Sequence, residues 1–442
     1  MERLIENKLL GWKNSRRRKP LILRGARQIG KTWIVKEFGD RYYKNIVTVD
    51  LEKERELHSF FEKSLDPLMI IQSIEIIKRT KIEEGRTLLF FDEIQSCPRA
   101  ITALRYFYEE MKGIHVIAAG SLLEFALSEI SFPVGRVQFL NMYPMTFAEY
   151  LMASDNGTAL EIVQSEPQEL PEQIHDALLN ELRTYFLIGG MPESIKVFLE
   201  SGSMTDSFAV HNELIATFQD DFSKYAPYAD KHCLRDVFKN VARTIGSQIK
   251  YTHLSDSFSS PTVKKAFETL LNAKIIKKIP SVGDITPPFH LNISLKKFKS
   301  LLLDVGLWQQ LTGMSNYLEL AQADLSNIYR GALAEQFVGQ ELVCATDGEL
   351  CYWARDKKGS NAEVDYLVSI DGKPYPIEVK SGNAGSLKSM HMILEKYPSC
   401  PVGIVFSSRP FARLEEQKLV FLPLYYCGGI MSMCQNVGEI RL

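Results

Sequence analysis

Features that mark secreted and membrane proteins are scarce in this sequence. The seven cysteines are scattered, odd in number and never spaced as C-x-x-C, which argues against a disulfide framework and a zinc ribbon. The eight histidines form no cluster with the spacing of metal ligands. No apolar run approaches the ~20 residues of a membrane span, and charged residues fill the beginning of the chain, where a signal peptide has an apolar core. We therefore expect a soluble cytoplasmic protein without a membrane partner.

An overall excess of charge is also missing. The 52 Lys and Arg residues nearly balance the 54 Asp and Glu residues, for a net charge of −2. The balance hides one basic stretch, residues 231–300, in which 13 basic residues face 4 acidic ones, an excess of +9. The length of 442 residues exceeds what one hydrophobic core usually holds, so several domains are expected.

The clearest motif is a phosphate-binding loop near the beginning of the chain. It fits G-x-x-x-x-G-K-[ST] without a mismatch. An apolar run, residues 21–23, precedes it as a short buried strand, and a helix pattern follows it. The residues expected to contact the nucleotide are those of the loop and the first one after it: Gly25, Ala26, Arg27, Gln28, Ile29, Gly30, Lys31, Thr32 and Trp33.

Strand, glycine loop and helix form the arrangement that phosphate binding needs. Backbone N–H groups and the helix N-terminus face the phosphates. Lys31 is expected to reach the β- and γ-phosphates, and the Thr32 hydroxyl is expected to hold Mg²⁺. The motif predicts that the chain binds ATP with Mg²⁺.

The second half of this site is expected after the strand at residues 87–92. Asp92 would order Mg²⁺ and Glu93 would polarise the attacking water. Ser121, at the tip of a later strand, is either a γ-phosphate sensor or a plain turn serine. Arg136 is either an arginine finger or an ordinary surface arginine.

Alternating strands and helices predict a parallel sheet in residues 1–153, with ligands at the carboxyl ends of its strands. Residues 154–230 are expected to form a helical arm or lid that begins with a polar linker, residues 154–173. The sequence leaves open whether the chain forms a homo-oligomer.

Residues 231–300 have the outline of a winged helix-turn-helix. Helices are expected at 234–245, 252–258 and 261–273, followed by a two-stranded wing. The third helix is expected to expose Thr262, Lys264, Lys265 and Thr269 to DNA, with Lys277 and Lys278 on phosphates. The alternative is a solvated basic face on a module that only packs between domains.

A second group of chemistry-bearing residues lies in residues 301–442. Glu378 and Lys380 are two apart on one expected strand and share a face. Asp365 on a neighbouring strand and Glu335 on a helix can join them. Carboxylates of this kind hold Mg²⁺ or Mn²⁺, and Lys380 could orient a water nucleophile, as in metal-dependent phosphodiester cleavage.

Taken in order, these motifs resemble a large group of prokaryotic AAA-like ATPases. The segments that carry the resemblance span nearly the whole chain: GARQIGKT, LLFFDE, AAGS, GRV with YPMTFAEY, GGMPES, LLLDVGL, and EVDYLV with PIEVKSG. The resemblance implies an AAA-type core, a winged-helix linker and a tail similar to the PD-(D/E)xK restriction-endonuclease fold. The sequence departs from the group's usual pattern at Ala26, Ala119 and Val364.

The sequence therefore predicts an α/β multidomain protein in which nucleotide state controls a DNA-binding, nuclease-like tail, and it leaves open whether this tail cleaves DNA. Two alternatives stay open at this point. One is an ATP-driven switch whose nuclease-like tail binds DNA or protein without cutting. The other is a protein-remodelling ATPase.

Overall fold

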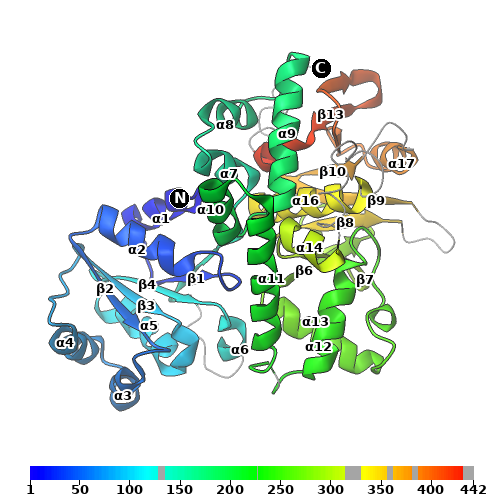
Figure 1. Cartoon of the computed structure of the whole chain (residues 1–442). Helices are drawn as coiled ribbons and strands as arrows, with labels where there is room; N and C mark the ends of the chain where they lie inside the picture. The colour runs from blue at the N-terminus through cyan, green and yellow to red at the C-terminus, as the bar shows by residue number, and fades with distance from the viewer. Residues whose placement is uncertain (128–134, 226, 314–329, 356–361, 381–386, 432–442) are drawn as a thin grey trace. The chain divides into compact units, whose positions relative to one another are not determined.

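The computed structural model describes residues 1–127, 135–225, 227–313, 330–355, 362–380 and 387–431 (Figure 1). The chain divides into two compact units. The first consists of Met1–Tyr143 with Asn272–Lys274, and the second of Pro144–Leu271 with Ile275–Leu442. In the described part of the chain, no helix combines the length and the apolar character needed to cross a membrane.

The first unit alternates strands with helices. Its elements are α1 (Ile5–Asn14), β1 (Leu21–Arg24), α2 (Lys31–Tyr42), β2 (Asn45–Asp50), α3 (His58–Lys63), α4 (Pro67–Lys78), β3 (Thr87–Asp92), α5 (Pro98–Glu110), β4 (His115–Gly120), α6 (Leu123–Leu127) and β5 (Gln138–Asn141).

The strands of the first unit form one parallel sheet in the order β2-β3-β4-β1-β5. β3 and β4 are buried along their whole length, as is typical of parallel strands covered on both faces. Apolar side chains of α3, α4 and α5, among them Ile74 and Leu104, pack on one face against Val49 and Phe91. Helix α2 lies on the other side of the sheet (Figure 1). The expected parallel nucleotide-binding sheet is therefore present.

The second unit begins with helices and ends with a mixed sheet. Its helices are α7 (Phe147–Ala153), α8 (Gly157–Gln164), α9 (Glu172–Ile188), α10 (Pro192–Ser201), α11 (Met204–Asp221), α12 (Lys231–Ala242), α13 (Ser260–Asn272), α14 (Val305–Thr312), α16 (Arg330–Ala345) and α17 (Lys388–Lys396). Its strands are β6 (Ile276–Val282), β7 (Ile293–Leu302), β8 (Cys351–Ala354), β9 (Glu363–Ile370), β10 (Lys373–Val379), β11 (Gly403–Ser407), β12 (Ala412–Leu414) and β13 (Leu419–Pro423).

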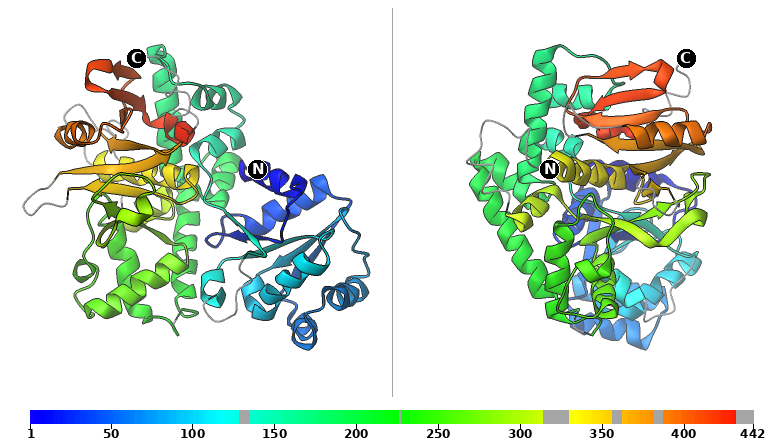
Figure 2. Two further views of the ribbon diagram at one scale, coloured as in Figure 1. Left: turned by 180° about the vertical axis from the view of Figure 1, so that it is seen from behind. Right: turned by 90° about the vertical axis from the view of Figure 1, so that its right-hand side faces the viewer.

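These strands form one sheet in the order β12-β13-β11-β10-β9-β8-β6-β7 (Figure 2). The wing is expected from a strand at residues 274–279 and a return near residues 289–293. β6 overlaps the first, but Phe289–Asn292 is a 3₁₀ turn and the return strand is β7. β6 and β7 pair antiparallel, and β6 continues the sheet by pairing parallel with β8. β7 runs through the boundary that the sequence places between residues 300 and 301.

Two helices cover the middle of this sheet. α16 contacts β7 and β10, and α17 contributes Met390 and Ile393 to an apolar cluster with Val364 and Leu367 of β9. The register of β9 with β8 shifts between Cys351 and Trp353. A bulge of this kind re-aims side chains, and here it lets both Val364 and Leu367 join the cluster around α17 although they are three positions apart on β9.

Three local expectations are wrong. The segment 154–173 contains helix α8. Asn156 caps this helix, because its side-chain oxygen accepts from the Ala159 N–H at 3.3 Å, and the Val163 side chain is buried. Instead of a helix at 252–258 there is one 3₁₀ turn, Tyr251–His253; the Ser255 hydroxyl accepts from the Ser257 N–H (3.3 Å), which competes with a helix.

The third correction concerns the helix expected to face DNA. Thr269 of α13 is buried, and its hydroxyl donates to the Lys265 carbonyl oxygen at 2.8 Å. Thr269 is therefore part of the core side of α13 rather than of its exposed face.

Candidate functional site

The phosphate loop connects β1 to α2 and depends on two glycines. Gly25 has φ +153° and Gly30 has φ +93°. A Cβ atom on Gly25 would lie 2.4 Å from the Met142 carbonyl oxygen, so no other residue fits there. Gly30 directly precedes α2, so the loop ends at the N-terminus of a 12-residue helix. Such an end presents unpaired N–H groups to an anion.

Lys31 is buried inside this loop. Its Nζ donates to the carbonyl oxygens of Gly25 (3.0 Å) and Ala26 (2.6 Å). Burial lowers the pKa of Lys31 to about 8, although the charges of Glu93 and Asp92 oppose this shift. The ammonium is thus held by neutral carbonyl groups, which do not fully compensate its loss of hydration. Such a cation is suited to bind phosphate groups.

The acids expected in the second half of the site lie at the end of β3. A hydrogen bond from the Thr32 side chain reaches Asp92, whose pKa is raised because burial outweighs that bond. Glu93 follows in the left-handed region (φ +47°) and its carboxylate accepts from the Gln95 side-chain amide. A non-glycine residue in this conformation stores strain of the kind found at functional sites.

Three strand ends bring these groups together. β4 lies between β3 and β1, and the Leu23–Ala119 and Phe91–Ala118 pairs align their carboxyl ends. Ser121, just beyond β4, accepts a hydrogen bond from Arg27 Nε of the loop at 3.3 Å. The loop, Ser121 and Asp92 therefore share the edge of the sheet where ligands of α/β folds bind.

Two other predicted residues lie on the surface of the first unit. The Trp33 side chain is 43% exposed. Arg136 binds Glu109 of α5 through an Nε–Oε1 contact of 2.7 Å and is 45% exposed. Within one chain, Arg136 is therefore engaged by a surface acid.

The second predicted group of residues also comes together, around a residue that the sequence did not single out. Lys299 of β7 has a side chain only 4% exposed. Its Nζ lies 3.2 Å from Glu335 Oε1, 2.6 Å from Glu363 Oε1 and 3.4 Å from Asp365 Oδ1. The ring of Tyr352 covers the ammonium at 5.2 Å. We call these side chains, with Glu378 and Lys380, the carboxylate cluster.

Glu378 and Lys380 form the other part of the carboxylate cluster. Lys380 Nζ lies 2.6 Å from Glu378 Oε1. Glu378 Oε2 is buried and has no hydrogen-bond partner within the described ranges of the chain. Asp365 Oδ2 accepts from the Val379 N–H at 2.9 Å, which ties β9 to β10 at this point.

Burial and mutual repulsion shape the charges of the carboxylate cluster. Burial and the charge of Asp365 raise the pKa of Glu335 well above its usual range and that of Glu378 to about 7. For Lys299, burial alone would lower the pKa, but Asp365, Glu335 and Glu363 raise it overall. The Lys299 ammonium therefore stays charged.

The predicted metal ligands Glu335, Asp365 and Glu378 are neighbours, but a lysine lies among them. Over the residues that the structure describes, no group of three or more His, Cys, Asp or Glu side chains is arranged to hold a metal ion. A role of these residues as ligands stays a prediction.

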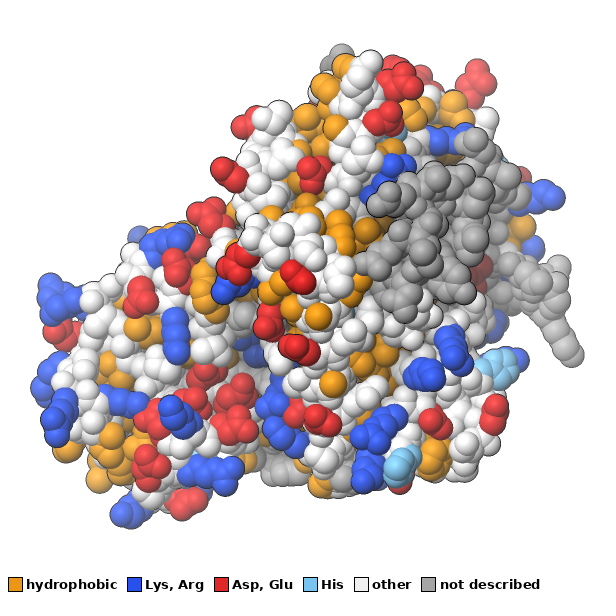
Figure 3. Space-filling view, in the orientation of Figure 1, with side chains coloured by type: hydrophobic (Ala, Val, Ile, Leu, Met, Phe, Trp, Pro, Cys, Tyr) orange, Lys and Arg blue, Asp and Glu red, His pale blue; other side chains and the backbone are white. Residues whose placement is uncertain are grey.

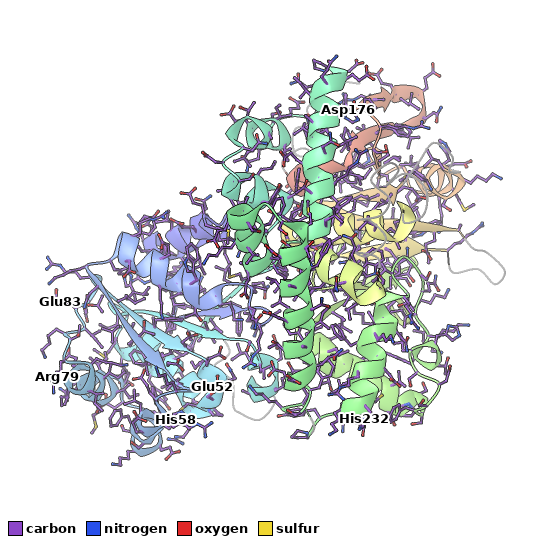
Figure 4. The ribbon with its side chains drawn as sticks, viewed as in Figure 1. Glu52, His58, Arg79, Glu83, Asp176 and His232 are labelled. Carbon is purple, nitrogen blue, oxygen red and sulfur yellow. The ribbon has the colours of Figure 1, made fainter. Side chains whose placement is uncertain are left out.

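The predicted DNA contacts are spread over α13 and β6. Lys264 and Lys265 are exposed on α13, and Lys264 pairs with Glu268 at 3.7 Å. Lys277 and Lys278 on β6 are half-buried, and Lys278 Nζ lies 4.6 Å from the centre of the Phe298 ring. Figure 3 shows further Lys and Arg side chains gathered over α12, whose second residue, His232, is labelled in Figure 4.

Comparison with protein families agrees with the geometry of the first unit. Residues 17–151 match a family described as an AAA domain. Residues 179–318 and 330–426 match two domains of unknown function, DUF8612 and DUF4143. Residues 17–151 are thus similar to AAA-type P-loop ATPase domains, a similarity that implies binding of ATP and Mg²⁺. The other two matches say nothing of activity.

Curated relatives add little on function. An uncharacterized protein of Mycobacterium tuberculosis and one of Mycobacterium bovis are each 25% identical over 229 residues. The match covers 50% of this chain and 48% of each relative, so it spans about half the length of the curated relatives.

Among solved structures, the Walker-type ATPase PABY2304 of Pyrococcus abyssi is 16% identical, with a TM-score of 0.45 over 70% of this chain and 95% of its own. RuvB T158V of Thermotoga maritima is also 16% identical, with a TM-score of 0.30 over 62% of this chain and 89% of its own. Both scores are too low to support a conclusion about this chain.

Proposed function

We propose that the chain is an ATP-driven switch in which Mg²⁺-dependent ATP hydrolysis in the first unit controls DNA binding by the second. The observation that carries the first half is the shared sheet edge of Lys31, Thr32, Asp92 and Glu93. The donor set fits the ligands: a buried ammonium for phosphate oxygens, and a hydroxyl beside a carboxylate for Mg²⁺.

Each of these side chains has a distinct role in the proposal. Lys31 binds the β- and γ-phosphates, and Thr32 with Asp92 holds Mg²⁺, which when bound neutralises phosphate charge. Glu93 orients the attacking water, and Gln95, which donates to it, keeps its carboxylate in place. Ser121 is the candidate sensor because Arg27 connects it to the loop.

Glu93→Gln tests this assignment. We expect ATP affinity within about threefold of wild type and a loss of turnover of about 10²-fold or more, because only the positioning of water is removed. Glu83→Gln is the matched control: Glu83 precedes the opposite end of β3, pairs with Lys44 and is labelled in Figure 4. Unchanged turnover in Glu93→Gln would refute the role of Glu93.

DNA binding is supported by the charge of residues 231–300 and by the exposure of lysines on α13. Phosphate contacts of this kind are salt-dependent. Cleavage is not part of the proposal, because Lys299 lies among the carboxylates that would hold the metal. The second unit is then a nuclease-like interaction domain of the winged-helix and restriction-endonuclease type.

A mobility-shift titration tests this half. Replacing the four predicted contacts Lys264, Lys265, Lys277 and Lys278 with Gln should weaken binding of duplex DNA and reduce its salt dependence. The control removes four exposed basic residues of the first unit, Lys44, Lys53, Arg79 and Lys81. Equal binding by both variants, or none by wild type with ATP, would favour the protein-remodelling alternative.

A further inference from the structure

Lys299 lies where a lysine is costly to bury. It belongs to β7, next to Phe298 and Ser300, which are also buried, and its own side chain is 4% exposed. An isolated buried ammonium loses several kcal/mol of hydration. Lys299 must therefore be compensated, and three carboxylates form ion pairs with it.

The compensation has the form of a coordination shell. Oxygens of Glu335 on α16 and of Glu363 and Asp365 on β9 lie at 2.6 to 3.4 Å from one Nζ atom. The shell is itself anchored, because Gln248 Nε2 donates to Glu363 Oε2 at 2.9 Å and the Tyr366 hydroxyl donates to the Glu335 carbonyl oxygen at 2.8 Å.

A second observation concerns Glu378 on the neighbouring strand β10. Glu378 is 8% exposed, yet among the residues that the structure describes its Oε2 has no hydrogen-bond partner, while its Oε1 is bound by Lys380. Four carboxylates thus meet two ammonium groups, one of them at the centre of three.

A divalent cation and Lys299 exclude each other here. Mg²⁺ and Ca²⁺ need oxygens at about 2.0 to 2.6 Å, and the same Glu335 and Asp365 oxygens already face Nζ. An ammonium within such a shell would repel the metal. We propose that Lys299 is a built-in cation that takes the place of a divalent metal in the carboxylate cluster.

The consequence is a site that resembles a metal centre but is closed to metals. Removing the Lys299 charge should open it, because three anchored carboxylates and the unpartnered Glu378 oxygen would remain. Lys299→Met preserves the length of the apolar side chain and deletes only the ammonium. The proposal is independent of DNA binding and of ATP hydrolysis.

The test is a Mn²⁺ titration of the full chain without nucleotide, followed by the electron paramagnetic resonance of free Mn²⁺. All proteins carry Asp92→Asn, so that the Mg²⁺ site proposed for the first unit does not contribute. The parent should bind no Mn²⁺ at the cluster up to about 1 mM, and Lys299→Met should bind one ion per chain at least roughly tenfold more tightly. Lys296→Met, an exposed lysine on the same strand, should behave as the parent.

Two results would overturn the proposal. One is a folded Lys299→Met protein, judged by circular dichroism, that binds Mn²⁺ no better than the parent. The other needs no Lys299 variant: a parent that binds one Mn²⁺ per chain and loses it on Asp365→Asn. If Lys299→Met alone does not fold, the pair Lys299→Met with Glu363→Gln removes one uncompensated charge and is titrated instead; failure of this pair to exceed the parent counts against the proposal.

Discussion

Two buried lysines distinguish the two units. Lys31 of the first unit donates to carbonyl oxygens of Gly25 and Ala26, and burial lowers its pKa to about 8. Lys299 of the second unit is bound by three carboxylates, which raise its pKa. Both ammonium groups are hidden from water, but only the second is neutralised by the protein itself.

The groups that surround a buried lysine indicate whether it binds a ligand or neutralises charges of the protein. A lysine held by neutral dipoles gains from an incoming anion, because its desolvation is incompletely compensated. A lysine inside a shell of carboxylates gains nothing further and acts as a structural counter-ion. A buried lysine therefore marks a phosphate-binding site in the first unit, whereas in the second unit its ammonium takes the place of a metal ion.

Removing Lys31 should have the largest effect on activity. Lys31→Ala deletes both the phosphate-binding cation and the bonds that hold the loop, so we expect ATP turnover to fall about a thousandfold. Phosphate release measures it. Lys44→Ala, an exposed lysine of the same unit paired with Glu83, is the control and should retain turnover. Equal turnover in Lys31→Ala and wild type would mean that the loop is not the catalytic site.

Removing Lys299 should destabilise the second unit without any ligand. Lys299→Met leaves buried carboxylates uncompensated, and we expect a loss of about 3 kcal/mol. Adding Asp365→Asn should recover part of it. Urea unfolding in metal-free buffer, in a background with Trp12 and Trp33 replaced by Phe, reports on Trp308 and Trp353 of this unit. If Lys299→Met lost no stability, the carboxyl groups would already be protonated and hydrogen-bonded to one another, and they would need no cation.

The pH dependence of ATP binding should separate the two lysines further. Without ATP, Lys31 loses its proton near pH 8, and the phosphates favour the charged form. Affinity should thus be constant below pH 8 and fall by up to about tenfold per pH unit above it. Phosphate groups titrate near pH 6, about two units lower, and do not interfere. Lys31→Met should show a flat profile between pH 7 and 9; a flat wild-type profile would contradict the lowered pKa.

The first of these sites could be predicted from the sequence because its parts are local. Gly25 to Thr32 are contiguous, and Asp92 follows from the rule that parallel strands end at one edge. Lys299 could not be predicted in this way. It lies 36 residues from Glu335 and 66 from Asp365, and a lysine between Phe298 and Ser300 has the appearance of a surface charge.

The shape of the second unit shows the same limit. The pattern of residues 301–442 predicts the strands that carry Asp365 and Glu378, whereas the pattern of residues 231–300 predicts a separate two-stranded wing. The pairing of β6 with β8 joins those strands to the sheet, and this contact links Val282 to Trp353, far apart in the chain. Whether two strands form a separate wing or join a larger sheet depends on tertiary pairing, because the alternation of apolar and polar residues is the same in both arrangements.

The smallest effect is expected at Arg136. Its ion pair with Glu109 is exposed and screened by solvent, and Arg136 is occupied by this surface acid, so Arg136→Ala should change turnover less than about threefold. Arg105→Ala is the matched control, because Arg105 binds the same Glu109 oxygen at 3.1 Å from the same surface. A loss of about 10³-fold in Arg136→Ala alone would instead identify an arginine finger. Because Arg136 is held by Glu109 within one chain, such a loss would mean that Arg136 leaves Glu109 to reach a nucleotide. Turnover that rises with protein concentration would show that this nucleotide is bound by a second copy of the chain rather than by the same chain.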